Sequence, residues 1–80
     1  MNTMELNVAM LRNRVSALDM ADVLMMSRVS FNKRRDGHTP FLQHEIVLLA
    51  QALNLTAEQV NIIFFDGNLP DSKYVPASVL

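Results

Sequence analysis

The stretch from Ser16 to Gly37 constrains the fold most, because it combines two short helices with a tight turn. Ser16 and Asp19 have the spacing of a capping box, in which each side chain accepts the backbone N–H of the other residue. Ser27 can cap a second helix that ends at Asp36-Gly37, where glycine readily adopts a left-handed conformation. Helices this short are unstable alone in water. The pair therefore needs a surrounding helical bundle.

The two helices of this pair differ in character. Met20, Ala21 and Leu24 recur at helical spacing and give the first helix one buried face. The second helix, over residues 28–35, is polar and cationic, with its apolar Phe31 expected to face inward. Helix pairs with a cationic second member are used to place that helix in the major groove of DNA.

Helical periodicity predicts three more helices around the pair. The first covers residues 4–12, with Thr3 as its N-cap and Asn13 as a left-handed exit. Another covers residues 43–53, and the last begins with a capping box at Thr56. The residues expected to face the core from these helices are Leu6, Ala9, Met10, Ile46, Leu49, Ala50, Leu53, Val60, Ile63 and Phe64.

Composition limits the classes of function that the chain can have. Its 80 residues make one domain, and the absence of cysteine excludes disulfides and thiolate metal sites and favours the cytoplasm. No apolar run is long enough to span a membrane, and no signal peptide is expected. There is no phosphate-cradling glycine loop, no credible catalytic set of side chains, and His38 and His44 make a poor metal site. We expect neither an enzyme nor a cofactor or metal.

Charge is distributed unevenly along the chain. The formal net charge of −1 is low for a nucleic-acid binder. However, six of the seven Lys and Arg residues lie between Arg12 and Arg35, and four of them lie in the second helix of the pair. Such a local concentration can attract phosphates, although a solvated charged face without a partner is the alternative. For Arg12 and Arg14 ordinary exposed charge is the preferred interpretation.

From about Thr3 to Phe65 the chain resembles the lambda-repressor-like helix-turn-helix family, in particular small Cro-like or repressor-type regulators of phages and prophages. The resemblance lies in the order and spacing of several features, which are Ala21, Ser27-Arg28, Phe31, Asp36-Gly37, TPF at 39–41, EIVLLAQALNLTAEQV at 45–60 and IFF at 63–65. The family implies an all-α, five-helix DNA-binding domain over residues 1–65, followed here by an extended tail over residues 66–80. It also implies binding to a double-stranded DNA operator, often as a homodimer.

Three positions depart from the family pattern. Met25 stands in the turn where many members have glycine, because the backbone there is often left-handed. Leu42 stands at the cap of the fourth helix, although leucine cannot accept a hydrogen bond. Arg35 replaces an apolar residue, so we expect its stem to lie along the core and its guanidinium to reach outward.

The resemblance assigns roles to the cationic helix and the loop after it. The residues expected to contact base edges are Arg28, Val29, Asn32 and Lys33. Arginine suits guanine, asparagine suits adenine and an aliphatic side chain can touch the thymine methyl. The residues expected to contact phosphates are Arg34, Arg35, His38 and Thr39.

A second function remains open from the sequence. Apolar residues stand where the family usually has polar ones, and with a neighbouring methionine they could form a partner surface of Leu18, Val23, Met25 and Met26. The chain would then be an antirepressor or repressor-modulating module that binds a phage repressor protein. The tail is similarly open, because it is either a frayed terminus or a segment exchanged across a dimer.

Overall fold

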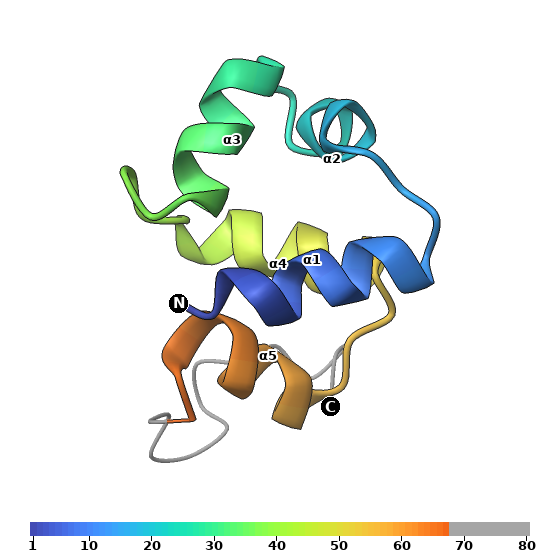
Figure 1. The fold of residues 1–80 in the computed structure, drawn as a ribbon, viewed down its shortest axis with the longest axis vertical. Helices are drawn as coiled ribbons and strands as arrows, with labels where there is room; N and C mark the ends of the chain where they lie inside the picture. The colour runs from blue at the N-terminus through green and yellow to red at the C-terminus, as the bar shows by residue number, and fades with distance from the viewer. Residues whose placement is uncertain (68–80) are drawn as a thin grey trace.

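A computed structural model describes residues 1–67 of the chain, and these residues form a bundle of five helices (Figure 1). The helices are α1 (Thr3–Arg12), α2 (Ala17–Val23), α3 (Arg28–Arg35), α4 (Gln43–Ala52) and α5 (Ala57–Phe65). No strand occurs in this range, so the expectation of an all-α fold is confirmed. The predicted tail and its two alternatives fall mainly on residues 68–80, which lie outside the described residues.

The core lies where α4 passes behind α1 in the middle of the bundle. The pair α2 and α3 lies on one side of these two helices and α5 lies on the other (Figure 1). Ile46 and Phe64 are half-buried against the core, whereas the other predicted inner residues are fully buried. The buried apolar residues are Leu6, Ala9, Met10, Met20, Ala21, Leu24, Phe31, Leu49, Ala50, Leu53, Leu55, Val60 and Ile63.

Side-chain caps begin α2, α3 and α5 as predicted from the sequence. The Ser16 N–H donates to Asp19 Oδ2 over 2.8 Å, and the Asp19 N–H donates to Ser16 Oγ over 3.1 Å. The Ser16 backbone N–H, and to a lesser extent the Ser16 side chain, favour the charged carboxylate and lower the pKa of Asp19. Ser27 accepts from the N–H of Ser30, and Thr56 and Gln59 form a second capping box.

The ends of α1 differ from the prediction. The N-cap is Asn2, whose side chain accepts the N–H of Glu5, and Thr3 instead donates its hydroxyl to the Arg35 carbonyl over 2.7 Å. At the other end the left-handed residue is Arg14 (φ +54°) and not Asn13. The Asn13 amide donates to the carbonyls of Ala9 and Leu53, and so ties α1 to the end of α4.

The turn between α2 and α3 keeps the left-handed geometry that the family resemblance implies. Met25 has φ +54°, and the next N–H, from Met26, donates to the Ala21 carbonyl over 3.0 Å. The Met25 side chain is 90% exposed, so it gains almost no burial in return. The turn therefore carries a steric cost of about 1 kcal/mol that a glycine would avoid.

Candidate nucleic-acid interface

Phe31 fixes which side of α3 faces solvent. Its side chain is completely buried, and its ring lies 6.1 Å from the ring of Phe41 (centroid to centroid), in the segment that leads into α4. Residues half a helical turn away from Phe31 must therefore point out of the bundle. This buried aromatic contact orients the whole helix.

The exposed side of α3 carries an aliphatic residue between cations. Val29 and Lys33 lie one turn apart and are both exposed, and Arg28 is exposed at the start of the helix. The first turn of α3 contains no acidic residue. Because the N-terminal end of a helix is electropositive, Arg28 adds to a positive potential there. We name Arg28, Val29 and Lys33 the α3 stripe.

Asn32 lies beside the α3 stripe and is only half-buried. Its side-chain oxygen Oδ1 is buried and has no hydrogen-bond partner in the described part of the chain. A buried acceptor without a donor costs about 1–3 kcal/mol, and the amide would have to turn outward before Oδ1 could meet a ligand. Asn32 thus remains a candidate for base contact, at the edge of the stripe.

Arg34 points inward, in contrast to its predicted role at a phosphate. Its Nε donates to Glu45 Oε1 over 3.0 Å, and its Nη1 lies 3.3 Å from the carbonyl oxygen of Ser30. Glu45 is 5% exposed and also accepts the N–H of Leu42 over 2.9 Å. A buried carboxylate needs such partners, so Arg34 is held by its pair with Glu45.

Arg35 is also turned toward the protein. Its Cζ lies 5.9 Å from the centroid of the Phe31 ring, its Nε is buried without a hydrogen bond to residues 1–67, and the same atom lies 3.8 Å from Asp36 Oδ1. The stem follows the core as expected, and the guanidinium lies within cation–π distance of the Phe31 ring, with the side chain only partly exposed. The exposed cations of α3 are therefore Arg28 and Lys33.

The loop after α3 turns back over the end of the helix. Gly37 has φ +87°, and the N–H groups of His38 and Thr39 both donate to the Lys33 carbonyl, over 2.9 and 3.3 Å. His38 is exposed and Thr39 is half-buried. Within the described residues no cluster of three or more His, Cys, Asp or Glu side chains could hold a metal ion. The loop is placed beside Lys33, at the C-terminal end of α3.

The second predicted surface is formed in part. Leu18, Val23 and Met25 are exposed on α2 and the turn, whereas Met26 is half-buried and packs against the core. Met26 therefore contributes less to a partner surface than we predicted.

The ion pair between Arg34 and Glu45 was not predicted from the sequence. The signal was present, because Leu42 cannot cap α4 and Glu45 stands three residues later, where its carboxylate can accept the N–H of Leu42. Here the capping carboxylate is buried and pairs with Arg34, whereas the capping carboxylate of Asp19 is exposed. The choice of Arg34 depends on how α3 crosses α4, which no local pattern encodes.

Comparison of the chain with models of known protein families, with curated proteins and with solved structures found no match. Over residues 1–67, none of the helices combines the length and the hydropathy needed to cross a bilayer.

Proposed function

We propose that the chain is a sequence-specific DNA-binding transcription regulator of phage or prophage type. In this proposal α2 and α3 are a lambda-repressor-like helix-turn-helix, and α3 enters the major groove. The observation that carries the proposal is the α3 stripe, Arg28, Val29 and Lys33, which is exposed on a helix that the buried Phe31 anchors to the core. An exposed cationic stripe on a rigid helix suits the groove of a polyanion.

Each group at this surface has a suitable partner on DNA. Arg28 and Lys33 can donate to the guanine edge, Val29 can contact a thymine methyl, and Asn32 can bind adenine through its amide. His38 and Thr39 would meet the backbone phosphates from the adjoining loop. Arg34 and Arg35 would reach phosphates only by leaving Glu45 and Phe31, so we assign them to holding α3 in place.

Selection of bound duplexes from a random pool tests this function. We expect the wild-type chain to enrich one motif, and Lys33→Ala to relax preference at one base pair by about 1–3 kcal/mol. Arg14→Ala removes an exposed charge outside α3 and is the matched control, which should keep the motif. Failure to enrich any motif, or an identical motif with Lys33→Ala, would contradict DNA reading by α3.

A second candidate function is a protein-interaction module that modulates a phage repressor. It is favoured by the apolar side chains of Leu18, Val23 and Met25, which stand in solvent at the α2 end of the domain. Such patches often mark partner surfaces, and methionine adapts to varied contacts.

The test of this candidate is a double substitution, Leu18→Glu with Val23→Glu. Both side chains are exposed, so the thermal unfolding midpoint should change little, whereas capture of a cognate repressor should be lost. Undiminished capture by the double variant would show that the patch is not the partner surface.

A further inference from the structure

The outer face of α1 presents an apolar stripe to solvent. Met4 and Leu11 are 74% and 78% exposed, and Val8 lies half-buried between them along the same face. These residues follow the i, i+4, i+7 spacing of a helix face, and they lie opposite the side of α1 that enters the core. We name Met4, Val8 and Leu11 the α1 stripe. Exposed apolar stripes of this kind mark contact surfaces.

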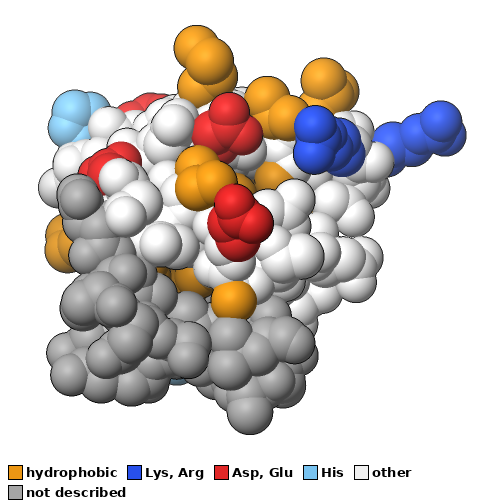
Figure 2. Space-filling model, turned by 90° about the horizontal axis from the view of Figure 1, so that it is seen from below, with side chains coloured by type: hydrophobic (Ala, Val, Ile, Leu, Met, Phe, Trp, Pro, Cys, Tyr) orange, Lys and Arg blue, Asp and Glu red, His pale blue; other side chains and the backbone are white. Residues whose placement is uncertain are grey.

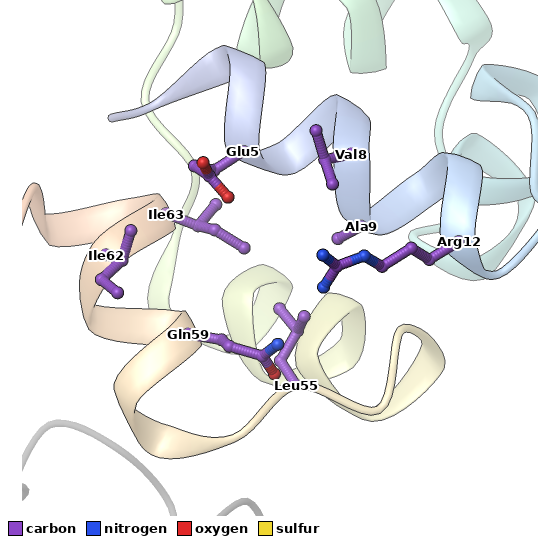
Figure 3. Close-up of a pocket in the computed structure, with 8 residues that line it drawn as sticks. All are labelled: Glu5, Val8, Ala9, Arg12, Leu55, Gln59, Ile62 and Ile63. Carbon is purple, nitrogen blue, oxygen red and sulfur yellow. The ribbon is translucent and has the colours of Figure 1, made fainter.

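A shallow hollow runs beside the α1 stripe, between α1 and α5. Its volume is about 50 Å³, and its floor is apolar, with Leu55, Ile62 and Ile63 among the lining residues. Glu5 and Arg12 also line it, and Figure 3 shows them on different sides of the hollow. Among residues 1–67 neither of these charged side chains forms an ion pair. Figure 2, which views the molecule from below, shows hydrophobic, acidic and basic side chains close together on the surface.

The arrangement of these residues along α1 is self-complementary. Leu11 follows Met4 by seven positions, and Arg12 follows Glu5 by seven positions. The midpoint of the first pair lies just before Val8, and the midpoint of the second pair lies just after it. Seven residues span about two helical turns, so each pair occupies one face of the helix. If a second α1 lies antiparallel about a two-fold axis at Val8, Met4 lies within about 1.5 Å, measured along the helix, of the level of the partner's Leu11. Glu5 lies equally close in level to the partner's Arg12. Each of these contacts then occurs twice.

We propose that this face of α1 is an isologous interface between two copies of the chain. A second copy supplies apolar groups opposite the stripe and an opposite charge for both Glu5 and Arg12, which is the self-complementarity that a two-fold contact requires. The inference goes beyond DNA binding and does not rest on it. A two-fold axis directed from α5 toward α3 in the view of Figure 1 also keeps both α3 helices on the same side of the pair.

Sedimentation equilibrium on the full chain tests the interface by charge reversal. The wild type should pass from its mass of 9.0 kDa to twice that mass as its concentration rises from about 1 µM to 1 mM. Glu5→Arg alone and Arg12→Glu alone should each weaken self-association about tenfold or more, because like charges then meet twice. An equimolar mixture of the two variants should form a heterodimer, since each copy again meets opposite charges.

Three results would overturn the proposal. They are a wild type that stays monomeric up to about 1 mM, single variants that associate as strongly as the wild type, and a mixture that does not associate. Circular dichroism of each variant checks that α1 remains folded.

Leu11→Glu should abolish association, while the matched Leu18→Glu, another exposed leucine but on α2, should leave it intact. The reverse pattern would place the contact on α2.

Discussion

Single residues in this domain show where backbone geometry takes precedence over residue preference. Four non-glycine residues adopt positive φ in residues 1–67, namely Arg14, Met25, Asn54 and Asp66. Each follows a helix, where a left-handed residue lets the next N–H groups reach the last free carbonyls. Methionine is the least suited of the four to this conformation, because its side chain forms no local hydrogen bond that would offset the steric cost.

Replacing Met25 by glycine should stabilise the domain. The steric cost of a left-handed methionine disappears, while the added backbone entropy of glycine in the unfolded chain returns part of the gain, so we expect about 0.5–1 kcal/mol in the free energy of unfolding. Urea denaturation measures the change. Asn54→Gly is the control, and its free energy of unfolding should rise less, because asparagine tolerates positive φ. A loss of stability in Met25→Gly would mean that the methionine side chain makes contacts that matter.

The capping carboxylate of Asp19 should make stability depend on pH. The pKa of Asp19 is lowered on folding, so its charged form stabilises the folded domain fully at pH values above its ordinary pKa of 3.8. This contribution to the free energy of unfolding is lost as the pH falls through the lowered pKa of the folded state. The wild type should therefore be more stable than Asp19→Ala at pH 7, and the difference between their free energies of unfolding should narrow in acid. Thermal unfolding of both proteins between about pH 2 and 7 measures it, and a gap independent of pH would contradict the assignment.

At the scale of elements, α3 is held by packing on α2 and by the buried Phe31, and polar contacts at its C-terminal end add to this. Arg34 joins it to Glu45 of α4, and the Arg35 carbonyl accepts the hydroxyl of Thr3 from α1. The exposed start of α3 has no comparable tie in residues 1–67 beyond its packing on α2 and the Ser27 cap. These polar contacts thus hold the C-terminal end of α3, while the exposed side chains near its start are available to a ligand.

Removing the Glu45 carboxylate should weaken the contact between α3 and α4. Breaking a buried ion pair from one side costs about 3–5 kcal/mol, and because the Arg34 side chain is 20% exposed we expect about 2 kcal/mol for Glu45→Ala. Arg34→Met with Glu45→Leu removes both charges and should recover part of the loss. Chemical denaturation of Arg34→Met, Glu45→Leu and the double variant gives the coupling free energy. If the losses of unfolding free energy in the single variants simply add up in the double variant, the ion pair does not connect the two helices.

Much of this architecture could be predicted from local sequence. Capping at Ser16, Ser27 and Thr56 depends on side chains and N–H groups three residues apart, which the sequence alone specifies. Thr3 was mistaken for a cap because its competing partner, the Arg35 carbonyl, is distant in sequence. The inward turn of Arg34 was missed for the same reason, since it depends on the packing of two helices.

At the scale of the whole molecule, the formal net charge of −1 leaves little general attraction to DNA. If the proposed function holds, affinity for DNA must come from few contacts made at close range, through the α3 stripe and the loop at His38 and Thr39. Arg28 and Lys33, the exposed cations of α3, offset phosphate charge when they lie in the groove, whether they donate to a base edge or to a phosphate. We therefore expect a log–log salt slope of about −2 for each copy bound. Such a slope is shallow for a DNA-binding protein and distinguishes this arrangement from a broad basic surface.

The most direct test of the central claim is the salt dependence of binding to the selected duplex. Arg28→Gln removes an exposed cation from α3, and Arg14→Gln removes an exposed arginine from the loop between α1 and α2. We expect Arg28→Gln to reduce the slope by about 0.9 per bound copy and Arg14→Gln to leave it unchanged. Equal slopes for Arg28→Gln and the wild type, or an equal reduction by Arg14→Gln, would contradict the placement of α3 against DNA.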